Sequence, residues 1–210
     1  MVIVDDEALV RSGFDHILSA APDIEVVAAT DGVQAVATIA ETRPDVVLLD
    51  IRMPGRNGLE VLADLTASGD GPVIAMLTTF DTDEHIATAL QGGASGFLVK
   101  DTDPTQLPQL VRTLHGGGVV FSPIVSRIVV SGYLGRDSGT DAAALEVLTP
   151  RELEVLDRLS RGQTNSEIGE GLYLSVGTVK AHVSSVLAKL GVKSRVEAAL
   201  VAERAGLLAE

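Results

Sequence analysis

Short apolar runs that alternate with amphipathic segments constrain the fold of this chain more than any other feature. The runs are rich in valine, isoleucine and leucine and lack strict polar alternation, which is typical of strands buried on both faces of a parallel sheet. They span residues 2–4, 25–29, 46–49, 73–77 and 96–99. The segments between them carry apolar residues at helical spacing. Five strands alternating with five helices predict a doubly wound α/β domain of the (βα)5, flavodoxin-like kind.

The pattern changes twice along the chain, which predicts two domains and a connector. Three consecutive glycines end the last amphipathic segment of the first part. The next stretch combines a short helical pattern with a loop-like run at residues 135–140, and the pattern after it is entirely helical. We therefore expect an α/β domain over residues 1–118, a linker with one helix over 119–147, and a small all-α helix-turn-helix domain over 148–210.

Proline and capping residues predict where three of the helices begin. Pro104 is expected just inside the start of the last helix of the α/β domain, since proline is favoured in a first turn. In the linker, Ser122-Pro123 is expected to open a helix. Thr149-Pro150 has the same arrangement at the start of the all-α domain, and Glu152 places an acid in the first turn.

Four of the five apolar runs end in polar or reactive residues. In an open parallel sheet, ligands bind beyond the carboxyl ends of the strands, so these side chains are expected to converge. They are Asp5 and Asp6 after the first run, Asp50 after the third, Thr78 after the fourth and Lys100 after the fifth. Any one acid is better explained as a solvated residue or a helix cap, but the five positions together favour a functional site.

The residue types at this edge suit phosphoryl chemistry. Three crowded carboxylates repel one another, and a hard divalent cation such as Mg²⁺, which takes oxygen ligands, offsets that repulsion. A carboxylate can also act as a nucleophile toward a phosphoryl group and form an aspartyl phosphate. A lysine can then neutralise the phosphoryl oxygens, and a hydroxyl can hydrogen-bond to one of them. Asp50, Lys100 and Thr78 fit these roles.

Residues 1 to about 118 resemble the receiver domain of bacterial two-component response regulators. The resemblance is carried by residues 4–7, 50–58, 78 and 96–100, in the family's order and spacing. It implies that Asp50 is the phosphoacceptor. It also implies that Asp5, Asp6 and Asp50 bind a metal ion, Mg²⁺, and that the backbone carbonyl of Arg52 completes the metal site.

The resemblance extends to residues around the phosphoryl group. Thr78 and Lys100 resemble the pair that contacts it. Phe97 resembles the switch aromatic that turns inward on activation, although without the resemblance it is better explained as a core residue of a strand. Many receivers have a cis proline after the lysine, whereas here Asp101 follows Lys100.

The formal net charge of −13 is unevenly distributed. Residues 1–118 contain 18 acidic and 6 basic residues, whereas residues 148–210 contain 8 of each. Residues 171–196 contain four basic residues and no acid. A local cationic stretch in an acidic protein suggests an anionic partner, although on charge alone a solvated helix face is the better explanation.

Residues 164–190 are predicted to form a helix-turn-helix, with a scaffold helix over 164–172, a turn over 173–176 and a recognition helix over 177–190. A plain helical bundle used for protein contacts is the alternative. The buried side of the recognition helix is expected to carry Val179, Val183, Val186, Leu187 and Leu190. Its outward face is expected to offer Lys180, Ala181, Ser184, Ser185 and Lys189 to phosphates and base edges.

Residues 148–210 resemble the LuxR-type helix-turn-helix domain, through residues 148–156, 165–168, 178–183 and 190–195. Gly169 stands where this family usually has alanine, which is expected to cost the scaffold helix up to ~1 kcal/mol. The last helix, with Val196, Ala199, Leu200 and Ala202, resembles the family's dimerisation helix. By position, Lys180, Ala181 and Ser184 fall where the family contacts bases, and Thr178, His182 and Lys193 fall at or near backbone-contact positions.

Together the two resemblances match the NarL/FixJ class of response regulators. They imply that a sensor histidine kinase phosphorylates Asp50, and that phosphorylation controls dimerisation and sequence-specific binding to a double-stranded DNA operator. The chain is then a transcription regulator that forms a homodimer when phosphorylated, and it is not a turnover enzyme.

Two other functions fit parts of the sequence. A phosphohydrolase with an aspartyl nucleophile, of the haloacid-dehalogenase kind, uses an Asp-x-Asp motif, but Arg52 occupies the second acidic position here. A DNA-binding regulator could also use its receiver only for dimerisation, without phosphorylation. The complete acidic pocket argues against that alternative.

Composition bears on the compartment. The absence of cysteine excludes disulfides and thiolate metal sites and is compatible with a reducing cytoplasm. The longest stretch without a charged residue has 15 residues, at 85–99, whereas a spanning helix needs ~20. The first residues become acidic at once and carry no basic region, unlike a secretory signal. These features predict a cytoplasmic protein without membrane insertion.

Overall fold

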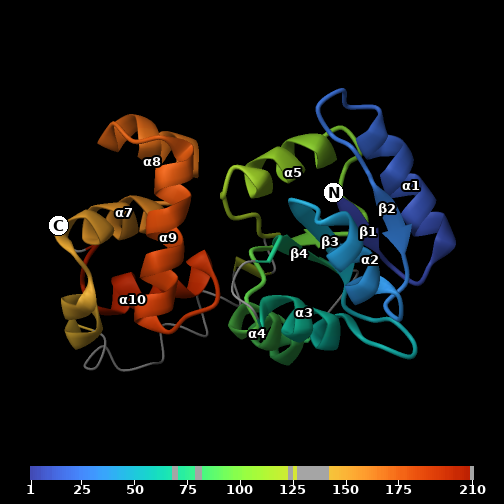
Figure 1. The fold of residues 1–210 in the computed structure, drawn as a ribbon. Helices are drawn as coiled ribbons and strands as arrows, with labels where there is room; N and C mark the ends of the chain where they lie inside the picture. The colour runs from blue at the N-terminus through green and yellow to red at the C-terminus, as the bar shows by residue number, and fades with distance from the viewer. Residues whose placement is uncertain (68–70, 79–81, 123–124, 127–141, 209–210) are drawn as a thin grey trace.

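The structure is a computed structural model of the 210-residue chain and describes residues 1–67, 71–78, 82–122, 125–126 and 142–208. It has two parts (Figure 1). The first part is a parallel sheet covered by helices on both faces, and the second part is helical. The fold class predicted from the sequence is therefore confirmed.

The sheet contains five parallel strands in the order β2-β1-β3-β4-β5. The strand order reverses between β1 and β3, and this switch point is where open α/β sheets bind ligands. Val4 of β1 pairs with Leu49 of β3, so the residues that follow each strand emerge together. The strands are β1 (Val2–Val4), β2 (Ala28–Thr30), β3 (Val46–Asp50), β4 (Val73–Thr78) and β5 (Gly96–Val99).

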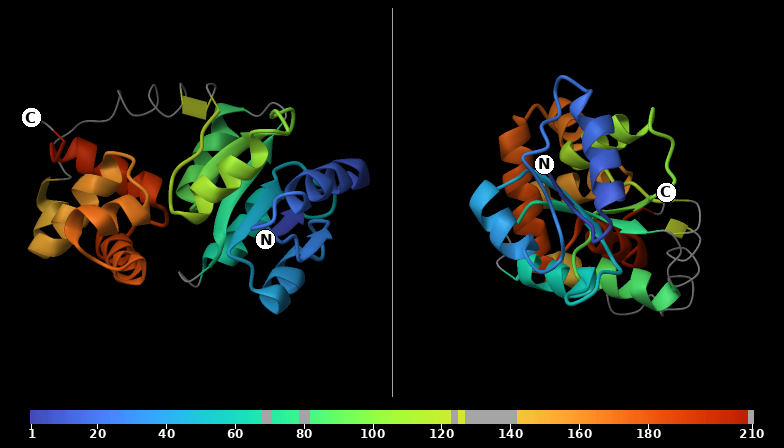
Figure 2. Two further views of the ribbon diagram at one scale, coloured as in Figure 1. Left: turned by 90° about the horizontal axis from the view of Figure 1, so that it is seen from above. Right: turned by 90° about the vertical axis from the view of Figure 1, so that its right-hand side faces the viewer.

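Helices α1 and α5 cover one face of the sheet, and α2, α3 and α4 cover the other (Figures 1 and 2). Both faces are dry. Leu48 of β3 belongs to the core beneath α1 and α5, while its neighbours Val47 and Leu49 belong to the opposite core. The helices are α1 (Ala8–Ser19), α2 (Ala35–Thr42), α3 (Gly58–Thr66), α4 (Asp83–Gln91) and α5 (Leu107–His115).

The second strand departs from the prediction. β2 lies further along the chain than residues 25–29, and it is only partly buried. The expectation of a strand buried on both faces is wrong here because β2 is an edge strand that pairs with β1.

The start of α5 also differs from the prediction. The helix begins at Leu107, and Pro108, not Pro104, is the proline of its first turn. Asp103 explains the delay: its carboxylate accepts hydrogen bonds from the backbone N–H and the hydroxyl of Thr105, at 2.8 and 2.7 Å. This local turn competes with the helix over the residues around Pro104.

Most of the expected linker lies outside the described residues, including Pro123 and the loop predicted at 135–140. Val125 and Ser126 are helical. A 3-10 helix, η1 (Ala142–Val147), leads into the helical part.

The helical part is built around one core, which includes Val155, Leu156, Ile168 and Val179. Thr149, Thr164, Ser175 and Ser194 each cap the helix that follows with their side-chain oxygen. Among the described residues, no helix is both long and apolar enough to cross a bilayer. The helices are α7 (Pro150–Ser160), α8 (Asn165–Leu172), α9 (Val176–Leu190) and α10 (Arg195–Arg204).

Candidate functional site

The acids predicted to converge do so at the carboxyl ends of β1 and β3. Asp5 and Asp50 are buried, and Asp6 is exposed. One carboxylate oxygen from each of the three lies within 4.8 Å of the others, close enough to ligate a single ion. This edge of the sheet thus ends in a compact acidic site.

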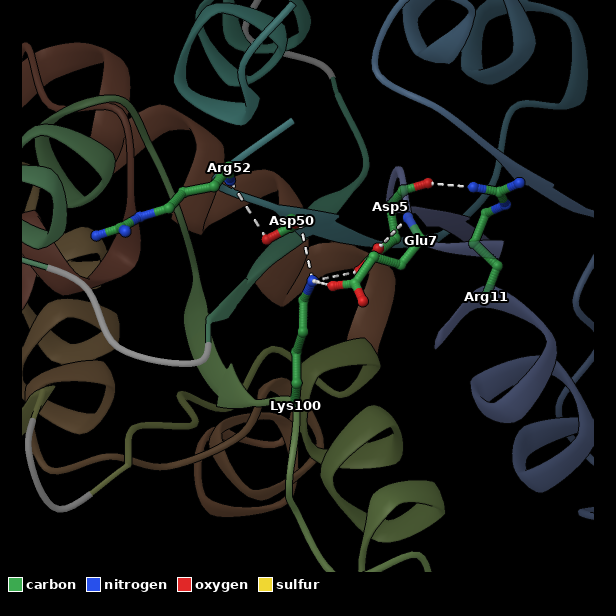
Figure 3. A network of polar contacts seen from close by, with 6 residues as sticks. All are labelled: Asp5, Glu7, Arg11, Asp50, Arg52 and Lys100. Atoms are coloured by element: carbon green, nitrogen blue, oxygen red, sulfur yellow. Dashed lines mark hydrogen bonds and ion pairs between the residues drawn. The ribbon is translucent and has the colours of Figure 1, made fainter. Parts of the chain in front are cut away.

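Lys100 reaches this site from the end of β5 (Figure 3). Its Nζ atom lies 2.8 Å from Asp5 Oδ2, 3.0 Å from Asp50 Oδ2 and 3.4 Å from Glu7 Oε1. Sequence reasoning did not assign a role to Glu7, whose carboxylate comes from the loop before α1. One ammonium group therefore forms ion pairs with three carboxylates.

The loop after β3 is shaped by a close backbone approach. A Cβ atom built on Gly58 would lie 2.0 Å from the carbonyl oxygen of Asp50, so only glycine fits. The Gly58 N–H donates to Ile51 O at 2.9 Å, and Asn57 and Glu60 form a capping box that starts α3. The Arg52 N–H donates to Asp50 Oδ1 at 3.3 Å, while the Arg52 side chain points away from the acids (Figure 3).

Thr78 and Phe97 lie on the neighbouring strands. Thr78 is buried at the end of β4, and its backbone is in register with Val99 of β5. Phe97 of β5 is fully buried, with its ring centroid 6.2 Å from that of Phe121 at a tilt of 52°. The aromatic ring is thus inward in this structure.

Helices α8 and α9 form the predicted helix-turn-helix. The recognition helix begins one residue earlier than expected, at Val176, because Ser175 caps it. A Cβ atom on Gly169 would lie 2.7 Å from the carbonyl oxygen of Leu174. Glycine at this position therefore permits the turn to approach α8 closely, which offsets its poorer helix propensity.

The recognition helix exposes Thr178, Lys180, Ala181 and Ser184, while His182 is half-buried. Lys193, in the loop after α9, is exposed. Val179 and Val186 are buried, as predicted. Ser185, which was expected to face outward, is half-buried, whereas Lys189 is exposed as predicted. Both side chains bind the carboxylate of Glu152, at 2.6 and 2.7 Å.

Two family models match this chain. The model described as a response regulator receiver domain matches residues 1–112, and the model described as bacterial regulatory proteins of the luxR family matches residues 146–202. The chain belongs to the LuxR-type response regulators. The family inferred from the sequence motifs is thereby confirmed.

Relatives of this regulator match it over nearly the full length of both chains. The transcriptional regulatory protein LnrK of Bacillus subtilis is 38% identical, over 99% of this chain and 97% of its own length. The transcriptional regulatory protein LiaR of the same organism is 36% identical, over 97% and 96%. The crystal structure of the response regulator ChrA, from a heme-sensing two-component system, is 32% identical, covers 96% of this chain and 94% of its own, and has a TM-score of 0.52.

The electrostatics of the receiver pocket leave it short of positive charge. Burial raises the pKa of Asp50 above its ordinary value, even though the hydrogen bond and charge of Lys100 act in the opposite direction. Burial alone would lower the pKa of Lys100, but Asp5 and Asp50 together raise it above its usual value. Lys100 is thus held as a cation, and it does not fully compensate the acids around it.

The donor set fits a hard cation. The Oδ2 atom of Asp5 is buried, and within the described ranges of the chain it receives no well-directed hydrogen bond, only the ion-pair contact from Lys100. Asp6 and Asp50 place further carboxylate oxygens beside it. Mg²⁺ prefers such oxygens and keeps several waters, which the exposed side of Asp6 allows.

The regulator's two parts also touch each other. The Asn165 N–H at the start of α8 donates to Gly116 O after α5, at 2.9 Å. Val196 and Leu200 of α10 pack against the receiver core that lies beneath α3 and α4. A cleft of about 1180 Å³ runs between the parts, and both Lys180 and Ser184 of the recognition helix line it.

Proposed function

We propose that a sensor histidine kinase phosphorylates Asp50 of this regulator, and that phosphorylation controls dimerisation and DNA binding. The observation that carries the proposal is the environment of Asp50. Its carboxylate is buried at the switch point of the sheet, with Lys100 Nζ 3.0 Å away and two further acids at ligand distance. Such a site suits an acyl phosphate better than a structural ion pair.

In the proposed transfer, a carboxylate oxygen of Asp50 attacks the phosphorus of the kinase's phosphohistidine. The O–P bond forms as the P–N bond breaks, and the histidine nitrogen keeps the electron pair. Lys100 neutralises phosphoryl oxygens, and the Thr78 hydroxyl hydrogen-bonds to one of them. No substrate is turned over, so the chain acts as a phosphoacceptor and not as an enzyme.

The proposed cofactor is Mg²⁺. Asp5, Asp6, Asp50 and the backbone carbonyl of Arg52 would hold it. When bound, it neutralises charge on the carboxylates and on the phosphoryl group.

We assign residues 1–118 to the receiver, 119–147 to the linker and 148–210 to the DNA-binding domain. Repositioning of Thr78 and Phe97 on phosphorylation would change the contacts between the parts and free α10 for a second copy of the chain. Dimerisation then supplies affinity for a two-half-site operator. In this proposal the protein is cytoplasmic, because it encounters both the kinase and chromosomal DNA in that compartment.

The residues proposed to meet DNA lie on α9 and just after it. Lys180, Ala181 and Ser184 would contact base edges in the major groove. Thr178, His182 and Lys193 would contact the sugar–phosphate backbone, which positions the helix without reading sequence.

Intact mass after incubation with acetyl phosphate and Mg²⁺ tests the phosphoacceptor. We expect one phosphoryl group on the wild-type chain, with acetate as the leaving group, and none on Asp50→Asn. An unmodified wild-type chain, or an adduct retained by Asp50→Asn, would refute the assignment. Gel shifts with and without an aspartyl-phosphate mimic then test control of DNA binding, and equal affinity in both states would count against it.

A further inference from the structure

Glu152 in the first turn of α7 has more partners than its local role requires. It is 5% exposed. Its Oε2 atom accepts hydrogen bonds from the backbone N–H and the hydroxyl of Thr149, at 2.7 and 2.9 Å, and its own N–H donates to the Thr149 hydroxyl. This is a capping box, and it accounts for the start of α7.

The same carboxylate also reaches across to the recognition helix. The Ser185 hydroxyl donates to Oε1 at 2.6 Å, and the Lys189 ammonium donates to Oε2 at 2.7 Å. Ser185 and Lys189 are four residues apart, so they lie on the same side of α9 in consecutive turns. Glu152 therefore binds α9 at two points that lie one helical turn apart.

A second capping box in the same domain lacks these long-range contacts. Glu167 binds the backbone N–H and hydroxyl of Thr164 at 2.7 and 2.8 Å, which is the local geometry of Glu152 and Thr149. Within the described part of the chain, the carboxylate of Glu167 accepts hydrogen bonds from Thr164 alone. Capping a helix thus does not require a partner on α9.

The helical period divides α9 into three sides. Val179 and Val186 face the core. Lys180, Ala181 and Ser184 are exposed on a second side. The half-buried Ser185 and the exposed Lys189 lie on a third side, where both bind Glu152 of α7. Two fixed sides determine the rotation of the helix about its axis, and therefore which side faces outward.

We infer that Glu152 is a positioning residue for DNA recognition: by binding Ser185 and Lys189 it fixes the rotation of α9, presents Lys180, Ala181 and Ser184 to base edges, and keeps Lys189 off the DNA phosphates. The inference rests on the proposed DNA-binding function. It assigns the cation of Lys189 to an ion pair within the protein and not to the electrostatic contact with DNA.

The salt dependence of DNA binding distinguishes these roles, because each phosphate contact adds about 0.9 to the slope of log affinity against log salt. The full-length chain, activated with beryllium fluoride and Mg²⁺, is titrated with a duplex selected by the wild-type chain from a random-sequence pool. A duplex of random sequence and equal length measures non-specific binding. The variants are Glu152→Gln, Lys189→Met, Lys193→Met as the phosphate-contact reference and, as the matched capping control, Glu167→Gln.

For Lys193→Met, which removes a proposed backbone contact, we expect the slope to fall by about 0.9, whereas Lys189→Met leaves it unchanged. Glu152→Gln releases Lys189, so its slope steepens by about 0.9 while the preference for the selected duplex over the random one falls by at least about tenfold. The added slope disappears in the double variant Glu152→Gln/Lys189→Met. Glu167→Gln keeps the wild-type preference and slope.

Several results would overturn the inference. A loss of slope in Lys189→Met equal to that of Lys193→Met would show that Lys189 contacts phosphate. Equal weakening by Glu152→Gln and Glu167→Gln on both duplexes would reduce Glu152 to a helix cap. If Glu152→Gln does not fold by circular dichroism, Ser185→Ala and Lys189→Met carry the test, and unchanged preference in both refutes it. A wild-type chain that binds neither duplex refutes DNA binding itself, and the inference with it.

Discussion

The two parts of this regulator each contain a carboxylate paired with a lysine, and the pairs differ in what surrounds them. Asp50 is 4% exposed and Glu152 is 5% exposed, so exposure does not separate them. Burial nevertheless raises the pKa of Asp50 above its ordinary value. Hydrogen bonds from Lys189, Ser185 and Thr149 hold the pKa of Glu152 well below its usual range.

Desolvation is the main influence on the pKa of Asp50 and a minor one on that of Glu152, and the two carboxylates also differ in how donors are shared. In the receiver, Lys100 is divided among Asp5, Glu7 and Asp50, which leaves a deficit of positive charge that a divalent cation can fill. In the DNA-binding part, the carboxylate of Glu152 has one lysine to itself. It also accepts hydrogen bonds from two hydroxyls and one backbone N–H. A carboxylate with too few hydrogen-bond donors and too little positive charge around it is suited to react. A carboxylate whose oxygens are fully hydrogen-bonded is suited to hold two helices together.

The largest expected effect is that substituting each carboxylate abolishes one activity and leaves the other intact. Asp50→Asn should abolish the phosphoryl adduct completely and leave phosphorylation-independent DNA affinity close to wild type, because Asp50 does not touch α9. Glu152→Gln should be phosphorylated as fully as the wild-type chain and should lose preference for the selected duplex. Intact mass and gel shifts on the same preparations measure both, and a variant that fails in both assays would break the contrast.

Backbone geometry around the receiver carboxylate gives the next largest effect. Gly58→Ala should destabilise the chain by at least about 2 kcal/mol, because the added Cβ would meet the Asp50 carbonyl at 2.0 Å. Gly13→Ala is the matched control: this exposed position in α1 has no atom within 4 Å of an added Cβ, so up to ~1 kcal/mol of stabilisation is expected. Thermal unfolding of the two variants compares them. Equal stability would mean that the loop after β3 moves freely.

The pH dependence of stability should differ between wild type and Glu152→Gln. Because folding lowers the pKa of Glu152, its stabilising contribution is fully present above the pKa of an unfolded glutamate, about 4.3, and is lost as the pH falls toward the lower folded value. Urea midpoints by circular dichroism should therefore be furthest apart near neutral pH and should converge in acid. A gap that stays constant with pH would mean that the charge of Glu152 does not stabilise the fold.

The smallest effect is expected at an exposed pair. Arg112 Nε donates to Asp23 Oδ2 at 2.8 Å, and this hydrogen bond lowers the pKa of Asp23 to about 2. Both side chains are largely in water, where such pairs contribute little. Asp23→Asn should leave the urea midpoint and the phosphoryl adduct unchanged. If Asp23→Asn lost as much stability as Glu152→Gln, burial and the number of hydrogen-bond donors would not explain why carboxylates in this chain differ.

Much of the receiver pocket could be predicted from the sequence. Asp5, Asp50 and Lys100 each follow an apolar run, and parallel strands must end at the same edge of their sheet. The edge strand β2 and the start of α5 were less predictable. Their limits depend on pairing with one neighbour and on a local turn at Asp103, which the apolar pattern does not reveal.

In the DNA-binding part, the sequence predicted the helices but not the polar contacts between them. Capping residues and the apolar period predicted the helices of the helix-turn-helix closely, but the sequence placed Ser185 and Lys189 among the outward residues. Their contact with Glu152 joins residues 33 and 37 positions apart. A helical pattern distinguishes apolar from polar sides and cannot say which polar side meets a neighbouring helix.

The sequence by itself determined the strand and helix types, the family and the set of acids beside Asp50, because periodicity and strand ends are local properties of the chain. Only the tertiary structure decided how the cations are distributed: Lys100 among three acids, and Lys189 on Glu152. That distribution depends on the rotation and distance of packed elements. It determines which carboxylate is left short of positive charge and which is fully bound.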